Sequence, residues 1–269
     1  MSQSSFGNKF KVTTWGESHG KALGAVIDGC PAGLPLCEED IQKFLDRRKP
    51  GQSRYTTARK EGDLVEILSG VFEGKTTGTP ISLMVRNTDQ RSRDYGNIAY
   101  SYRPGHADYT FDQKYGFRDY RGGGRSSGRE TIGRVAAGAI ASKILEELGI
   151  SICTYTKSIG PVEIASFNKE EIHQNAFYMP DAQAAVKAGE YLEECMKNQD
   201  SAGGVIECRI TGTPAGLGEP VFDKLSALLA HALMSIGAVK AVEIGDGIAV
   251  TSSNGSTDND GFTVKDGKI

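Results

Sequence analysis

The sequence has 269 residues, enough to bury a sizeable core in one large domain or two small ones. Its net charge is −3, and no apolar run approaches the ~20 residues of a membrane-spanning helix, which argues against a membrane protein. Glycine makes up 34 residues, nearly 13% against an average of about 7%, but without a collagen-like period, so fibrous and low-complexity chains are excluded.

Hydrophobic periodicity and turn residues predict a mixture of helices and strands. In chain order we predict strands at 10–15 and 22–27, a helix at 38–48, strands at 64–68 and 81–85, a long helix at 130–148, a strand at 152–156, a helix at 182–197, a strand at 204–211, a helix at 222–236 and a strand at 239–244. The order lacks regular βαβ alternation, so we expect an α+β fold with mostly antiparallel sheet. No linker is evident, and we predict one domain over 1–269.

The stretch 87–129 shows little periodicity and is predicted to be irregular. Six tyrosines within it argue against disorder. An ordered, irregular stretch of this length is uncommon in a compact protein and is typical of a functional region.

Charge is distributed unevenly along the chain. Residues 1–135 hold 21 Lys and Arg against 16 Asp and Glu, whereas residues 136–269 hold 10 against 18. Of the 14 arginines, 13 lie between Arg47 and Arg134. The planar guanidinium binds phosphate and carboxylate through paired hydrogen bonds, so the cluster indicates an anion site. For any single arginine, a solvated basic face remains the alternative.

Five cysteines, an odd number without CxxC spacing, predict reduced and mostly buried thiols in a cytoplasmic protein. We predict no metal site. No basic and then apolar segment opens the chain, so no secretory signal is expected.

Two of the four histidines lie in glycine-rich turns. His19 belongs to GESHG and His106 to RPGHAD. Histidine titrates near neutral pH and can act as a general acid or base, although a lone histidine in a turn is more often a satisfied polar residue.

Two further segments are candidate anion sites. The run YRGGGRSSGRET at 120–131 combines glycines, hydroxyls and arginines just before a predicted helix, whose N-terminus attracts anions. It contains no GK[ST], so an NTPase is a poor interpretation. The run RRKPGQSR at 47–54 places Arg54 beyond a helix end, where C-terminal capping does not explain it.

Together these segments resemble the chorismate synthase family. The resemblance covers essentially the whole chain, because each of its motifs is long and chemically unusual. The matching runs are GESHGKALGAVIDGCPAGLPL at 16–36, DRRKPGQSRYTT at 46–57, RPGHAD at 103–108, KYGFRDYRGGGRSS at 114–127, PAGLGEPVFDKL at 214–225 and VEIGDG at 242–247.

The resemblance implies helices sandwiched between antiparallel β-sheets in a homotetramer. It also implies conversion of 5-enolpyruvylshikimate 3-phosphate to chorismate and phosphate by anti-1,4-elimination, with reduced FMN and no net redox change. NADPH is implied as a possible reductant. The expected partner is a small anionic substrate rather than nucleic acid or membrane, and its carboxylates and phosphate account for the arginines.

The resemblance also implies roles for individual residues, carried over from its motifs. The implied catalytic residues are His19, Ser18, His106 and Ser127. The implied substrate-binding residues are Arg48, Arg54, Arg134 and His19, with NADP binding as an alternative role for Arg48 and Arg54. The implied cofactor-binding residues are Arg125, Ser126, Ser127, Gly237, Ala238 and His106.

The resemblance implies that members of the family continue beyond the position of Ile269, so that this chain lacks roughly the last quarter of the family's length. A hairpin with an Asp-Gly turn is predicted at 262–269. We therefore expect a C-terminally truncated chain that lacks part of the flavin site and is inactive or severely impaired.

Two other classes of function remain as alternatives. Arginines and tyrosines in one region also suit an RNA-binding module, through stacking and phosphate contacts, although the acidic net charge counts against it. A flavoprotein with net redox chemistry is the third interpretation, and consumption of a reductant in proportion to product would distinguish it.

Overall fold

The computed structural model describes residues 4–55, 61–88, 99–121, 123–265 and 267. It divides into two compact units, Met1–Thr213 and Pro214–Ile269, which we describe separately. The expected single domain over 1–269 stays a prediction.

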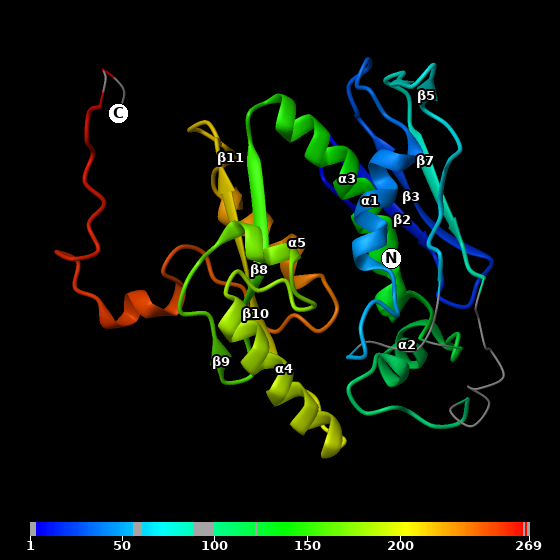
Figure 1. The fold of residues 1–269 in the computed structure, drawn as a ribbon. Coiled ribbons are helices and arrows are strands. Elements are labelled where there is room, and N and C mark those ends of the chain that lie inside the picture. The colour runs from blue at the N-terminus through cyan, green and yellow to red at the C-terminus, as the bar shows by residue number, and fades with distance from the viewer. Residues whose placement is uncertain (1–3, 56–60, 89–98, 122, 266, 268–269) are drawn as a thin grey trace. The chain divides into compact units, whose positions relative to one another are not determined.

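The first unit is built on a five-stranded antiparallel sheet (Figure 1). Its strand order is β1 (Ser5–Phe6), β2 (Lys11–Gly16), β3 (Ala22–Asp28), β7 (Ile81–Arg86) and β4 (Val65–Ile67). The central strand β3 pairs on both edges, so that Ala25 lies opposite Thr14 on one side and Leu83 on the other. Leu23, Ala25 and Ile27 alternate along it and are buried, as expected for a strand with one face on the core.

Two helices, α1 (Glu38–Arg48) and α3 (Thr131–Glu147), cover the buried face of this sheet. Acids open α1 and arginines close it, which favours its macrodipole. Gly133 lets α3 approach the sheet, because a Cβ there would lie 2.8 Å from the carbonyl oxygen of Gly24. The shared core contains Leu23, Ile27, Ile41, Leu45, Ile81, Leu83, Ile132, Ala136 and Ile140.

A second antiparallel sheet of the same unit carries another helix. Its strands run in the order β10 (Gly204–Thr211), β8 (Ser151–Ile159) and β9 (Val162–Glu163), and α4 (Ala182–Lys197) packs against β9. Buried Met179 and the alanines of α4 form the small core between them. Two short strands, β5 (Val71–Phe72) and β6 (Lys75–Thr76), form a separate hairpin.

The second unit is a small hairpin and helix followed by extended chain. It contains β11 (Gly218–Glu219), β12 (Asp223–Lys224), α5 (Leu225–Met234) and the 3₁₀ helix η5 (Gly247–Ser252). The prediction of a strand at 239–244 is wrong, because this segment is irregular and opens with a turn from Val239 N to Ile236 O. Residues 262–264 of the predicted C-terminal hairpin are also irregular, and 266, 268 and 269 lie outside the described residues. A β-branched run needs a pairing partner, and among the described residues the segment 239–244 has none, whereas Lys265 of the predicted hairpin lies in a β-bridge.

Most of the other predicted elements are confirmed, and the α+β class with antiparallel sheets is correct. The predicted bounds of α1, α4 and β10 match the observed ones. The stretch 87–129, predicted to be irregular, contains the helix α2 (Asp108–Tyr115) and two 3₁₀ turns, η2 (Gly124–Ser126) and η3 (Gly128–Glu130). Of α2 only Asp108 is buried, so no apolar stripe marks it in the sequence.

All five cysteines are free, as predicted, but only Cys30 and Cys195 are buried, so the expectation of mostly buried thiols is wrong. Within the described ranges, the helices are too short or too polar to cross a bilayer.

Candidate active site

The loop between β2 and β3 places Ser18 and His19 inside the first unit. The chain leaves β2 at Gly16 with φ of 87°, and a Cβ there would lie 2.3 Å from the carbonyl oxygen of Ala22. Ser18 is 1% exposed and His19 6%, and Ser18 Oγ lies 2.9 Å from His19 Nδ1. This contact fixes the imidazole's orientation.

Asn87, just after β7, holds this loop in place. Its Nδ2 donates to the carbonyl oxygens of Glu17 at 3.1 Å and Gly20 at 2.8 Å. Its Oδ1 accepts from Nε of Arg129 at 3.1 Å. Asn87 therefore joins the histidine loop to an arginine of the glycine-rich segment.

Arg129 continues the network to the end of α1. Its side chain is buried, and Nη2 donates to Asp63 Oδ1 at 3.0 Å. The other oxygen of Asp63 accepts from Nη1 of Arg48, also at 3.0 Å. Among the described residues, Nη1 of Arg129 is buried without a hydrogen-bond partner, which is costly for a charged group unless a ligand completes it.

The predicted cofactor residues Arg125, Ser126 and Ser127 lie just before α3. The side chain of Arg125 contacts β2, and the two serines form hydrogen bonds within their own loop. Arg125 donates to the carbonyl oxygens of Gly16 and Thr14 and to Thr14 Oγ1 at 2.7 Å. Ser126 Oγ donates to a carbonyl in the same turn, and Ser127 Oγ caps η3. The bonds of Arg125 attach the glycine-rich loop to β2, beside the histidine loop.

The predicted substrate residue Arg134 lies on the first turns of α3. Its Nε donates to both carboxylate oxygens of Glu130, at 3.1 and 2.9 Å. Glu130 also accepts from Thr14 Oγ1 at 3.2 Å. Thr14 thus joins Arg125 and, through Glu130, Arg134 to one point on β2.

Asp119 lies near both His19 and the glycine-rich loop. The guanidinium of Arg121 lowers the pKa of Asp119 through hydrogen bonds at 2.8 and 2.9 Å, and nearby His19 lowers it further. A Cβ on Gly124 would lie 3.6 Å from the Cβ of Asp119.

The second predicted histidine, His106, is exposed in the turn before α2. Its Nδ1 lies 3.1 Å from the carbonyl oxygen of Pro104. The guanidinium of the neighbouring Arg103 forms two hydrogen bonds with Asp108, its backbone N–H forms a third, and together they lower the pKa of that carboxyl to about 2. A Cβ on Gly123 would lie 3.6 Å from Arg103, so this turn adjoins the glycine-rich loop.

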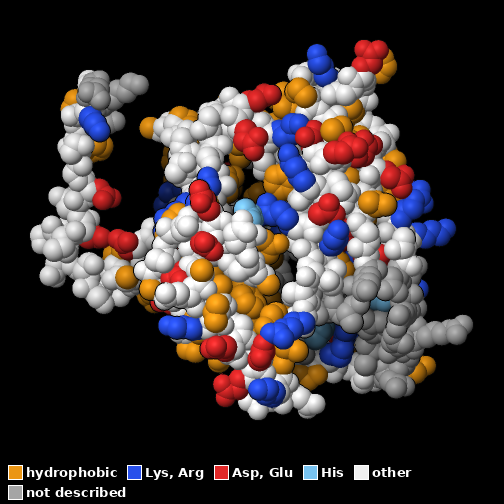
Figure 2. Space-filling model, viewed as in Figure 1, with side chains coloured by type: hydrophobic (Ala, Val, Ile, Leu, Met, Phe, Trp, Pro, Cys, Tyr) orange, Lys and Arg blue, Asp and Glu red, His pale blue; other side chains and the backbone are white. Residues whose placement is uncertain are grey.

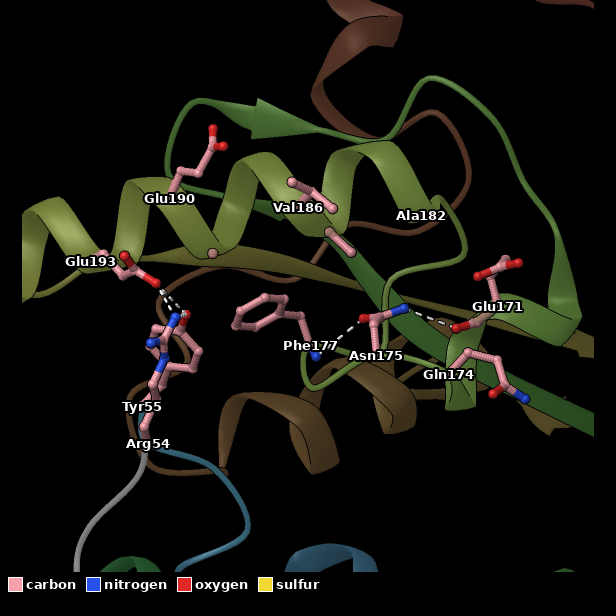
Figure 3. Close-up of a pocket in the computed structure, with 12 residues that line it drawn as sticks. Arg54, Tyr55, Glu171, Gln174, Asn175, Phe177, Ala182, Val186, Glu190 and Glu193 are labelled. Atoms are coloured by element: carbon pink, nitrogen blue, oxygen red, sulfur yellow. Dashed lines mark hydrogen bonds and ion pairs between the residues drawn. The ribbon is translucent and has the colours of Figure 1, made fainter.

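Arg54 is not brought together with Arg48. It lines a pocket of about 510 Å³ between the loop after α1 and α4. Figure 3 shows Arg54 and Tyr55 pointing toward Glu193, and the guanidinium forms an ion pair with that carboxylate. Arg54 Nη2 also donates to the Tyr55 hydroxyl at 2.8 Å, and Phe177 forms part of the wall.

The remaining predicted cofactor residues, Gly237 and Ala238, lie in the second unit. They follow α5, where Ala238 has φ of 69° and a Cβ on Gly237 would meet open space. Among the described residues, no group of three or more His, Cys, Asp or Glu could hold a metal ion.

The structure therefore joins most predicted residues of the first unit into one network, and it adds three that the sequence did not single out. Asp63, Asn87 and Arg129 connect Arg48 to the histidine loop. Only Arg129 carried a local signal, since it stands in the glycine-rich run. Asp63 and Asn87 lie in segments without a motif of their own, and only the fold brings them to the site.

The arginines outside this network argue against an RNA-binding surface. Arg103, Arg118 and Arg121 each pair with an aspartate six residues or fewer away. Figure 2 shows acidic and basic side chains interspersed over the face in view. Buried Ser18 and His19 beside several guanidiniums at the start of a helix instead characterise an enzyme site for a small anionic molecule.

Comparisons with known proteins identify the family. The family model described as chorismate synthase matches residues 10–268. Chorismate synthase of Agathobacter rectalis is 67% identical over 271 aligned positions, which cover 100% of this chain and 74% of that protein. The same enzyme of Lachnoclostridium phytofermentans is 67% identical, over 97% of this chain and 72% of that protein.

A solved structure described as chorismate synthase superimposes with a TM-score of 0.80 at 34% identity, over 97% of this chain and 76% of that one. The chain belongs to the chorismate synthase family. It is a carbon–oxygen lyase of the shikimate pathway, whose reaction converts 5-enolpyruvylshikimate 3-phosphate to chorismate and phosphate with a reduced flavin. The chain spans about three quarters of the length of these relatives.

Proposed function

We propose that the elimination takes place beside the Ser18–His19 loop, with His19 as the general acid for the departing phosphate. The observation that carries this proposal is the burial of His19 against Ser18, within a network that ends on the guanidiniums of Arg129 and Arg48. The reaction breaks the C–O bond to phosphate and removes one proton from the ring, so the leaving group gains from a proton donor.

Arg48 and Arg134 are proposed to bind the anionic groups of the substrate, and Arg129 is added to them. Its buried, unpartnered Nη1 supports this, since a phosphate or carboxylate oxygen would complete its hydrogen bonds. Arg54 is proposed for the same purpose, or for contact with NADPH as a reductant. In either role, the guanidinium of Arg54 has to release its ion pair with Glu193 before it can bind the ligand.

FMN is the proposed flavin, with Arg125, Ser126, Ser127 and His106 as its contacts in the first unit. A flavin phosphate fits the residues by charge, because the glycine-rich loop brings main-chain N–H groups and cations to the start of α3. Gly237 and Ala238 stay candidate flavin contacts on the strength of the family resemblance alone. When bound, the reduced flavin supplies the electron-rich partner that the elimination requires without net redox change.

Anaerobic assays with dithionite-reduced FMN test the role of His19. We expect His19→Ala to lower the rate of chorismate formation about 10²- to 10⁴-fold, the usual contribution of a general acid. Substrate affinity, measured by calorimetry, should change much less for His19→Ala.

His106→Ala is assayed under the same conditions, to test the proposed contact of His106 with the flavin. Rates are compared as ratios to the wild-type chain, and a His19→Ala rate equal to that of the wild type would remove His19 from the mechanism.

We also propose a homotetramer in the cytoplasm. Ile152, Ile206 and Ile210 share one face of the β8–β10 pair and are exposed, so a second copy could cover them. Five free thiols suit a reducing compartment. Light scattering coupled to gel filtration tests the assembly, and a monomeric mass would contradict it.

A further inference from the structure

Asp63 is the most deeply buried acid of the site. It lies just before β4, and its carboxylate is fully shielded from solvent. Its backbone has φ of 45°, in the left-handed region that Asp and Asn tolerate better than most residues. Gln42 of α1 holds the segment on both sides: its Nε2 donates to the Asp63 carbonyl at 3.3 Å, and its Oε1 accepts from Val65 N at 3.1 Å.

The two oxygens of this carboxylate divide between two arginines. Oδ2 accepts from Arg48, at the end of α1, and Oδ1 from Arg129, in η3, both at 3.0 Å. The two guanidiniums come from segments about 80 residues apart and would repel each other at this spacing. A shared carboxylate offsets that repulsion and fixes both in one orientation.

Each arginine is also held at other atoms. Arg48 donates from Nε to Thr131 Oγ1 at 3.1 Å and from Nη2 to the Gly128 carbonyl at 3.0 Å. Arg129 donates from Nε to Asn87. Asp63 is the one side chain among these acceptors that contacts both guanidiniums, so it links their orientations directly.

We propose that Asp63, held by Gln42, is a positioning residue of the anion site, which sets Arg48 and Arg129 side by side for one anionic group of the substrate. Asp63 does not touch the substrate in this proposal. The inference rests on the proposed role of Arg48 in binding the substrate.

Positioning and simple charge make opposite predictions for Asp63→Asn. The substitution keeps the shape and tolerates the left-handed φ, but it removes one negative charge near the bound anion. If only net charge mattered, the affinity for an anion would rise, because the site becomes more positive. If Asp63 positions the arginines, the affinity for the substrate falls. The amide NH₂ of Asn is a donor and cannot accept a hydrogen bond, so one of the two guanidiniums loses its partner.

The test is calorimetric titration of the full chain with 5-enolpyruvylshikimate 3-phosphate. We expect the Kd of Asp63→Asn to rise about tenfold. Glu66→Gln is the matched control: it removes the same charge from an exposed arginine pair, Glu66 with Arg86, and should leave the Kd within about twofold of the wild-type value. A Kd for Asp63→Asn that is unchanged or lower, in a protein with a normal circular dichroism spectrum, overturns the proposal.

Two further variants keep the result interpretable. If Asp63→Asn does not fold, Gln42→Ala decides, because it leaves the carboxylate in place and removes the hydrogen bonds that hold its segment, together with one to the exposed Asp46. Its Kd should rise about threefold, and an unchanged value overturns the proposal. Arg48→Ala separates the proposed substrate-binding role of Arg48 from the positioning role of Asp63. If this variant binds the substrate as the wild type does, the proposed role of Arg48 fails. If it weakens binding and Asp63→Asn does not, only the positioning role fails.

Discussion

Ser18 Oγ and His19 Nδ1 lie 2.9 Å apart inside the first unit, although the two residues are adjacent in sequence and occupy a turn. Both side chains are buried. The contact couples the orientation of the imidazole to the Ser18 hydroxyl.

Ser18→Ala should therefore slow chorismate formation about tenfold with pre-reduced FMN and change the substrate Kd less than twofold. The physical reason is loss of the hydrogen bond that orients the imidazole, while the arginines stay in place. Ser18→Thr keeps the hydroxyl and should recover most of the rate. Equal rates for Ser18→Ala and the wild type would show that the hydroxyl does not orient the proposed acid.

Glu193→Gln should strengthen binding of the anionic substrate if Arg54 is one of its ligands. In the structure the Arg54 guanidinium is bound to Glu193 of α4, so a ligand has to compete with that carboxylate. The side chains are 67% and 43% exposed, and screening by solvent keeps the pair weak. We expect a Kd lower by about two- to fivefold in calorimetry.

The control for this variant is Glu190→Gln, on the same helix and the same pocket wall, which removes an equal charge. It should leave the Kd within the error of the measurement. A Kd that rises in Glu193→Gln would mean that Glu193 holds Arg54 ready for the substrate instead of competing with it.

Asp181 should make the stability of the first unit dependent on acid pH. Its carboxylate accepts from the main-chain N–H groups of Ala184, Ala165 and Ser166, which lower its pKa to about 2. The folded pKa lies below the unfolded value of about 3.9, so the stabilisation is complete above that value. It is lost as the pH falls below that value and through the folded pKa of about 2.

Urea unfolding checks this prediction. Asp181→Ala should lower the free energy of unfolding by about 1–2 kcal/mol at pH 7, the usual cost of an N-cap with additional bonds. The difference from the wild type should shrink at pH 3. Asp200→Ala, an exposed aspartate beyond the end of α4, is the control and should change little at either pH. A difference independent of pH would show that the charge of Asp181 is not what stabilises the cap.

How far the sequence predicts this molecule depends on the range of the interactions concerned. The sequence predicts helix α1 with its observed bounds because its apolar face and its charged ends are both local features. The segment 239–244 has the composition of a strand, but composition does not supply the partner that a strand needs.

The site follows the same rule. His19 and the glycine-rich run carry local motifs, so the sequence alone marks them as candidate site residues. Asp63 is an isolated acid whose importance comes from two arginines, 15 and 66 residues away. Arg54 was predicted from its motif, but its ion pair with an acid 139 residues later depends on tertiary structure.

Two glycines of α3 provide a paired test of how closely this helix must approach the sheet. A Cβ on Gly133 would lie 2.8 Å from the Gly24 carbonyl oxygen and 2.9 Å from Cγ2 of Thr14, the residue that binds Arg125 and Glu130. A Cβ on Gly138, on the same helix, would meet no atom within 4 Å.

Gly133→Ala should therefore lower the free energy of unfolding by about 1–3 kcal/mol, because the backbone of β3 cannot yield as a side chain would. It should also weaken substrate binding, since the start of α3 moves away from the histidine loop. Gly138→Ala should raise stability by up to about 1 kcal/mol through helix propensity and leave binding unchanged. Thermal and urea unfolding measure both variants, and equal stabilities would mean that α3 can shift outward without affecting the packing around Thr14.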